Sequence, residues 1–304
     1  MRLLILGASG DQGAAQVHAA LAAGHSVKAA CRRPPLLEHA TSMEALEWVS
    51  VDYSQPTTLA PAMQGVNVVL ANFPSSSFND GPTLVRAAMA TGVAAHAAGV
   101  ALIVFNTSLP VMETPRGFAA HDVRLQMREA LEQSGVPVIS LQPVVFMDNL
   151  LRGWAFPHIA DRNRFVYPHE ANLEVCWICQ DDLAALMLAA AARPDLAGRH
   201  IAVGGPAPIR GTDVAAALTQ ASGREIRFES QSVEAFCLAM EALMQSRAPE
   251  ERSRMIRELG NIYRWYNTSA ERPFYVDMTP VLRELPVRLT SFAEWSARQH
   301  WRRE

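Results

Sequence analysis

The stretch Leu3-Leu4-Ile5-Leu6-Gly7-Ala8-Ser9-Gly10-Asp11-Gln12-Gly13 decides the fold of this chain. A short apolar run predicts a buried strand, and three glycines follow it at intervals of three residues. Gly7 permits a tight turn, Gly10 lets the backbone approach a pyrophosphate, and Gly13 lets a helix pack closely on the strand. The backbone N–H groups at a helix start attract anions, so the stretch predicts a dinucleotide-binding loop. A glycine-rich turn of another α/β protein is the alternative. The predicted loop residues are Gly7, Ser9, Gly10, Asp11, Gln12 and Gly13.

The first half of the chain continues this alternation of strand and helix. Apolar strands separated by helices indicate a parallel sheet that is buried on both faces. The expected fold is therefore α/β, a Rossmann-type doubly wound parallel sheet. After the first strand at 2–6, strands are expected at 26–32, 48–52, 66–71, 101–107 and 136–141, and helices at 13–23, 81–98 and 118–134.

The regular alternation ends near Pro143, where aromatic and proline-rich segments begin. We expect a nucleotide-binding domain over 1–150 and a smaller α+β substrate lobe over 151–304 that closes a cleft at the strand ends. The two are expected to be partly interwoven, because a late strand of the sheet is predicted near 200–203. Helices are predicted at 181–193, 211–222 and 233–265.

Composition excludes several classes of protein. A net charge of −3 over 304 residues gives no basic footprint for nucleic acid. No apolar run reaches the ~20 residues of a membrane span, and no signal peptide is recognised. The pair Cys176 and Cys179 has neither the second ligand pair nor the context that a metal or redox site needs. We expect a cytoplasmic protein without metal that acts on a small molecule. A homodimer and a regulatory protein partner both stay open.

The second predicted strand ends in a pair of arginines. An NAD site places an acidic residue ~20 residues after the glycine loop to hold the ribose 2′-hydroxyl. Arg32 and Arg33 stand there instead, and a guanidinium suits a phosphate. The sequence therefore favours NADP, and a solvated surface pair is the alternative.

Polar residues follow the next strands, at the edge where open α/β sheets bind ligands. Asp52 ends the third strand and is expected to reach the adenine amino group. Asn72-Phe73-Pro74 follows the fourth strand, and Asn106-Thr107-Ser108 follows the fifth. Ordinary turn chemistry is the alternative for these segments.

The order of these motifs resembles the NmrA-like family of atypical short-chain dehydrogenases/reductases, which includes isoflavone-reductase-like enzymes and bacterial quinone reductases. The glycine loop is similar to that family's GATGxQG, and the segment 27–34 resembles its second strand with a phosphate-binding arginine. The segments 134–143 and 146–149 resemble its sixth strand and nicotinamide-side loop, which implies that Pro143 and Phe146 contact the cofactor. Further similarity lies at 176–182, 274–277 and 291–295.

One departure from the family bears on catalysis. The resemblance implies a lysine early in the helix before the sixth strand, and Arg124 stands at that position. Arginine stays protonated and is a poor general acid, although it could hold the nicotinamide ribose or stabilise an oxyanion. His121 is the candidate proton donor, because an unperturbed histidine titrates near pH ~6.5. A partly exposed histidine at a helix start is the alternative. Ser108 completes the catalytic candidates.

Two functions remain open from the sequence. The first is an NADP-dependent reductase that transfers a hydride to a carbonyl, quinone or activated double bond. The second is a non-catalytic NADP(H)-binding sensor, which the family resemblance also implies. An aromatic-lined substrate pocket is a hypothesis, with hydrophobic core as its alternative; its candidates are Trp154, Phe156, Phe165, Tyr167 and Trp177.

Overall fold

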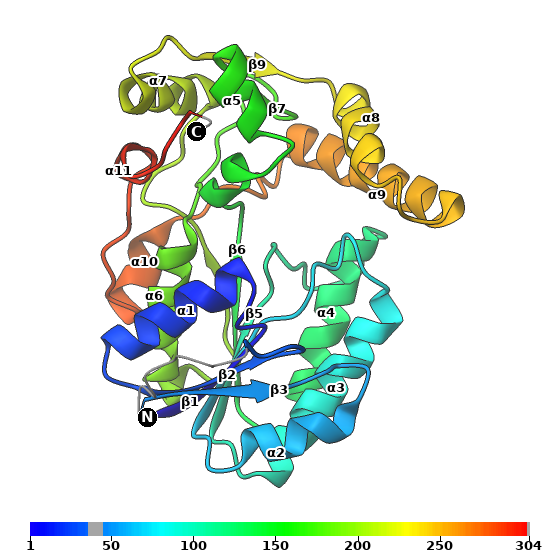
Figure 1. Cartoon of the computed structure of the whole chain (residues 1–304), viewed down its shortest axis with the longest axis vertical. Coiled ribbons are helices and arrows are strands. Elements are labelled where there is room, and N and C mark those ends of the chain that lie inside the picture. The colour runs from blue at the N-terminus through cyan, green and yellow to red at the C-terminus, as the bar shows by residue number, and fades with distance from the viewer. Residues whose placement is uncertain (36–44, 303–304) are drawn as a thin grey trace. The chain divides into compact units, whose positions relative to one another are not determined.

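The computed structural model describes residues 1–35 and 45–302 and divides into two compact units (Figure 1). The first unit combines Met1–Pro143, Gln180–Ala202 and Pro280–Val287. The second combines Val144–Cys179, Val203–Thr279 and the chain from Arg288 onward. The chain therefore passes between the two units more than once.

The first unit is built on a seven-stranded sheet with the order β3-β2-β1-β4-β5-β6-β8. Each pair of neighbouring strands in the series β3-β2-β1-β4-β5-β6 is parallel, which is the Rossmann arrangement. Every residue of β4, β5 and β6 is buried, as expected for strands covered on both faces. The strands are β1 (Arg2–Leu6), β2 (Ser26–Cys31), β3 (Leu46–Ser50), β4 (Val68–Ala71), β5 (Leu102–Asn106), β6 (Val138–Pro143) and β8 (His200–Val203).

Helices cover both faces of this sheet. Helices α1 and α6 pack together on one face, and α3 and α4 pack together on the other (Figure 1). The side chains of Leu4, Val69 and Phe105 join the core under α3 and α4. The helices are α1 (Asp11–Ala22), α2 (Leu59–Met63), α3 (Gly81–Ala97), α4 (Ala119–Glu132) and α6 (Gln180–Ala191), with short 3-10 turns at Pro56–Thr58 and Pro194–Leu196.

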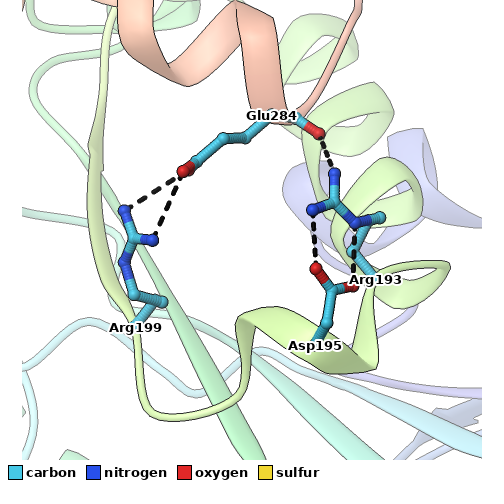
Figure 2. A network of polar contacts seen from close by, with 4 residues as sticks. All are labelled: Arg193, Asp195, Arg199 and Glu284. Carbon is cyan, nitrogen blue, oxygen red and sulfur yellow. Dashed lines mark hydrogen bonds and ion pairs between the residues drawn. The ribbon is translucent and has the colours of Figure 1, made fainter.

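A polar network fixes the late segment 280–287 to the first unit (Figure 2). The Arg193 guanidinium donates to the backbone oxygen of Glu284 at 2.6 Å and to the carboxylate of Asp195 at 2.8 and 2.6 Å. Arg199 donates to the Glu284 carboxylate at 3.3 Å from two nitrogens. The end of α10 (Met278–Glu284) is therefore held by the chain on either side of the turn Pro194–Leu196.

The second unit contains a two-stranded parallel sheet, in which β7 (Arg164–Tyr167) pairs with β9 (Arg227–Ser230). Helix α7 packs on this sheet and on α11, and α8 packs on α9. The remaining elements are the 3-10 turn Met147–Leu151, α5 (Phe156–Arg162), α7 (Gly211–Ser222), α8 (Val233–Leu243), α9 (Pro249–Thr268) and α11 (Phe292–Ala297).

Two predicted elements need correction. The helical region expected over 233–265 is two helices, because α8 ends at Leu243 and Pro249 starts α9. Proline is suited to the first turn of a helix and cannot continue an earlier one without losing a hydrogen bond. The third strand lies at Leu46–Ser50 rather than 48–52, so Asp52 lies beyond the strand.

Candidate nucleotide site at the carboxyl ends of the strands

The glycine loop joins β1 to α1 by a turn that needs two of its glycines. Gly7 has a φ of +69°, and the Gly10 N–H donates to the Gly7 oxygen at 3.0 Å. A Cβ at Gly13 would lie 2.3 Å from that same oxygen, which packing cannot accommodate. Gly7 therefore forms the turn and Gly13 allows the helix to approach the strand.

At Gly10, neither the backbone conformation nor the packing of the chain requires glycine. Its φ is −87°, which any residue adopts, and an added Cβ would meet only the Gly7 oxygen at 3.4 Å. Gly10 is exposed and precedes α1, whose N-terminus has no side-chain cap. The neighbouring Ser9 and Asp11 are also exposed. The packing of the chain does not require glycine at residue 10. The approach of an anion to the helix start would require it, because a side chain there would occupy the space of the anion.

The two arginines after β2 are exposed. Within residues 1–35 and 45–302, neither Arg32 nor Arg33 forms an ion pair. Asp52 accepts hydrogen bonds from the Ser54 N–H at 2.9 Å and the Ser54 hydroxyl at 2.7 Å. These bonds, with a smaller contribution from the charge of Arg32, lower the pKa of the Asp52 carboxyl. Asp52 is thus tied into a local turn beside the arginine pair.

A chain of amide side chains links the glycine loop to the ends of β4 and β5. Asn72 and Gln16 exchange hydrogen bonds at 2.7 and 2.9 Å, and Asn72 also donates to the Leu6 oxygen at 2.9 Å. Asn106 donates to the side-chain oxygens of Asn72 at 2.9 Å and Gln12 at 2.6 Å. Asn72 is therefore a buried structural link between three strands.

Ser108 joins the far end of this network of amide side chains and has a strained backbone conformation. Its φ is +61°, which non-glycine residues rarely adopt and which recurs at functional sites. Its N–H donates to the Asn106 side chain at 2.8 Å, and its hydroxyl donates to Gln12 at 2.9 Å. The buried Thr107 hydroxyl instead donates to the Leu109 oxygen at 2.6 Å. Ser108 is thus coupled to the glycine loop through one residue.

Arg124 is completely buried on α4, with 0% of its surface exposed. Its guanidinium donates to the Pro74 oxygen at 2.7 Å and the Phe73 oxygen at 3.5 Å. Burial lowers its pKa to about 10, so it remains charged at neutral pH. No carboxylate of the described residues pairs with it. Arg124 thus holds the backbone of the loop after β4.

Tyr53 completes the support of that loop. Its hydroxyl donates to the Asn72 oxygen at 2.8 Å, so the oxygens of three consecutive residues accept bonds from two side chains. Burial raises the pKa of the Tyr53 phenol. Neither Tyr53 nor Gln16 was singled out from the sequence. Gln16 could have been, because it lies one helical turn after Gln12.

His121 differs from the expected proton donor. Only 2% of its surface is exposed, and its Nδ1 lies 2.6 Å from the Pro110 oxygen, so that nitrogen carries the hydrogen. Burial lowers its pKa from 6.5 to about 4. The imidazole is therefore neutral at pH 7 and supports the loop after β5, as Arg124 supports the loop after β4.

The remaining candidates lie further along the chain. Pro143 is the buried last residue of β6 in the first unit. Phe146 belongs to the second unit, where it is buried and bridges to Ile178. Of the five aromatic candidates, Phe165, Tyr167 and Trp177 are buried in that unit, whereas Trp154 and Phe156 are half-buried.

The described residues offer neither a metal centre nor a membrane span. No group of three or more histidine, cysteine or acidic side chains there could hold a metal ion, and the four cysteines are free thiols. None of the helices in ranges 1–35 and 45–302 combines the length and apolar character that crossing a membrane requires.

The fold and the glycine loop define a Rossmann-like α/β protein with the architecture of a dinucleotide-binding domain. The model of the NmrA-like family matches residues 1–296, and the chain belongs to this family.

Two curated relatives are reductases. The chain is 30% identical over 306 residues to (4-alkanoyl-5-oxo-2,5-dihydrofuran-3-yl)methyl phosphate reductase of Streptomyces griseus, covering 97% of this chain and 96% of the relative. It is 29% identical over 215 residues to NAD(P)H azoreductase of Xenophilus azovorans, covering 68% of each chain.

Two solved structures share the fold. The NADPH-dependent quinone oxidoreductase of Escherichia coli, complexed with NADPH, has a TM-score of 0.75 at 19% identity, covering 98% of this chain and 99% of that one. NmrA, a negative transcriptional regulator in complex with NADP, has a TM-score of 0.75 at 15% identity, covering 98% and 94%. This fold therefore occurs both in a reductase and in a transcriptional regulator.

Proposed function

We propose that this protein is an NADPH-dependent reductase of hydrophobic or aromatic small molecules with a carbonyl, quinone or activated double bond. The observation that carries the proposal is Gly10, an exposed glycine at an uncapped helix start where the chain's own packing needs no glycine. The reductase activities named for the two curated relatives support the chemistry.

The cofactor would be held along the carboxyl edge of the sheet. The start of α1 would bind the pyrophosphate, and the Arg32–Arg33 pair would bind the 2′-phosphate that distinguishes NADPH from NADH. Both arginines are exposed and form no ion pair with another described residue, which supports that assignment. When bound, the nicotinamide would supply the hydride.

The proton that accompanies the hydride would not come from α4. His121 is neutral at pH 7 with Nδ1 bound to a backbone oxygen, and Arg124 is fully buried against two others. Both residues would position loops rather than exchange protons. Solvent would then protonate the reduced product, which is easiest for acceptors that form a stable anion.

A sensor of the NADPH/NADP⁺ ratio is the second candidate. It is favoured by the same burial of His121 and Arg124, which leaves neither exposed enough to act as an acid. Fold alone does not decide between the two functions.

A panel of acceptors separates them. Purified protein would be mixed with NADPH and with quinones, enones or azo dyes, and loss of NADPH absorbance would be followed. A reductase oxidises NADPH with at least one class and stops doing so in the Gly10→Val variant. If no acceptor is reduced, while NADPH and NADP⁺ bind with clearly different affinities, the sensor replaces the reductase.

A further inference from the structure

The loop after β5, residues 107–118, is here called the β5–α4 strap. Its first residues lie at the candidate nucleotide site, because the Ser108 hydroxyl donates to Gln12 of the glycine loop at 2.9 Å. Its middle reaches Arg128 in the third turn of α4 through the side chain of Glu113. All of these residues belong to the first unit. The strap therefore connects the glycine loop with a position well along α4.

Hydrogen bonds of the backbone fix the β5–α4 strap on both sides of Glu113. Before Glu113, the Val111 N–H donates to the Gln142 side chain at 3.2 Å. After it, the N–H groups of residues 116 and 117 donate to the Asp122 carboxylate at 3.0 and 2.8 Å. Glu113 therefore belongs to a short segment that can move while both of its ends stay attached.

The contact between Glu113 and Arg128 is incomplete. Arg128 Nη2 donates to the Glu113 carboxylate at 3.4 Å, whereas charged pairs of this kind usually lie at about 2.7–2.9 Å. Arg128 is buried, and its Nε and Nη1 have no hydrogen-bond partner among the described residues. The Glu113 side chain is 73% exposed, and its other oxygen lies 3.5 Å from His200 Nδ1. A buried guanidinium thus has two unused donors beside a carboxylate that lies mostly in water.

Further unpartnered polar atoms lie on the strand that α4 covers. The Ser140 hydroxyl and Gln142 Nε2 are buried without a hydrogen-bond partner among the described residues. Both residues share a face of β6 with Val138, whose side chain joins the core under α3 and α4. Buried donors without an acceptor are unfavourable. The region between α4 and β6 therefore contains donors that lack an acceptor, and Glu113 already contacts one of these side chains, Arg128.

We propose that the β5–α4 strap is a latch on the nucleotide site: when NADPH binds at the glycine loop, Glu113 moves inward and forms a two-bond ion pair with Arg128. The coupling runs through Gln12, which belongs to the glycine loop and holds Ser108 at the start of the strap. Because NADPH favours the latched form, the ion pair in turn stabilises bound NADPH. This inference rests on the NADPH binding of the proposed function and adds a conformational step to it.

Hydrogen exchange of the strap amides, followed by mass spectrometry, tests the latch. In the wild-type protein, NADPH should slow the exchange of residues 112–114 at least fivefold. Glu113→Gln should abolish this protection and weaken NADPH binding roughly five- to twentyfold, because the ion pair that stabilises the bound form is lost. Arg128→Met, which fills the same buried space without donors, should have the same effects. The double variant should bind NADPH no more weakly than either single variant, as expected for two residues of one interaction.

Glu129→Gln is the matched control, because Glu129 is an exposed glutamate of α4 that forms no ion pair with another described residue. It should bind NADPH as the wild-type protein does. Circular dichroism checks folding, and Glu113→Gln alone decides if Arg128→Met does not fold.

Two results would overturn the latch and leave the nucleotide site standing. One is NADPH binding to the wild-type protein without a change in strap exchange. The other is NADPH binding by Glu113→Gln as tight as that of Glu129→Gln. If exchange and affinity change as expected while no acceptor is reduced, the latch stands and the reductase function falls. A wild-type protein that does not bind NADPH would overturn both.

Discussion

Three polar residues of α4, two of them catalytic candidates from the sequence, are buried and support neighbouring loops. Arg124 holds the loop after β4, and His121 holds the loop after β5. Arg128, also buried, reaches Glu113 of the latter loop at 3.4 Å. The family resemblance implied that Arg124 stands at the position of a lysine. It could not predict the burial, because the oxygens that accept these bonds come from distant segments.

Buried His121 makes stability depend on pH. Its pKa is about 4 in the folded protein and 6.5 when unfolded, so the unfolded state binds more protons between those values. Stability is therefore complete above pH 6.5 and falls by up to roughly 3 kcal/mol as the pH approaches 4. His121→Asn, which keeps a donor for Pro110 but cannot titrate, should reduce this loss in urea titrations. His18→Asn, on the exposed side of α1, should retain it.

Arg124 should not be replaceable by lysine. One terminal nitrogen of the Arg124 guanidinium donates to both backbone oxygens and the other donates to the Met127 sulfur at 3.8 Å, whereas a lysine has a single compact ammonium group that cannot occupy both positions. Arg124→Lys should lower the free energy of unfolding by ~1–3 kcal/mol and weaken NADPH binding several-fold without raising turnover. Arg86→Lys on the exposed face of α3 is the control. A tenfold gain in kcat for Arg124→Lys would instead show that this position delivers a proton.

At the scale of elements, sequence motifs were sufficient to predict the structure where the backbone conformation of single residues determines it. The positive φ of Gly7 and the close contact at Gly13 agree with the turn and packing roles predicted from spacing. Helix α7 was predicted at its observed bounds, and it ends at Gly223 in the left-handed conformation. The break between α8 and α9 was missed, although Pro249 in the first turn of α9 marks the new start.

The glycines of the loop should respond differently to substitution. Gly13→Ala places a Cβ 2.3 Å from the Gly7 oxygen and should cost ~1–3 kcal/mol or more of folding free energy. Gly10→Val meets no such obstacle, so its cost should stay below about 1 kcal/mol while NADPH binding is lost. Thermal melts followed by circular dichroism, together with NADPH titrations, measure both. Tight NADPH binding by Gly10→Val would mean that the loop is only a turn.

At the scale of the whole molecule, the order of elements along the chain does not follow the division into units. Helix α6 and β8 arise late in the sequence, yet they belong to the first unit because they cover and extend its sheet. The late strand was predicted from its apolar pattern. The return of 280–287 was not, because it depends on Arg193 and Arg199 meeting Glu284 across 85 or more positions.

Transfer of hydrogen from NADPH to an organic acceptor tests the central claim most directly. The protein would be given NADPH deuterated at the transferable position of nicotinamide C4, with an aromatic enone in ordinary water. A reductase that takes its proton from solvent should place one deuterium on the β-carbon and an ordinary hydrogen on the α-carbon, with Gly10→Val giving no product. A product without deuterium, or no product with any acceptor while NADPH binds, would contradict the account.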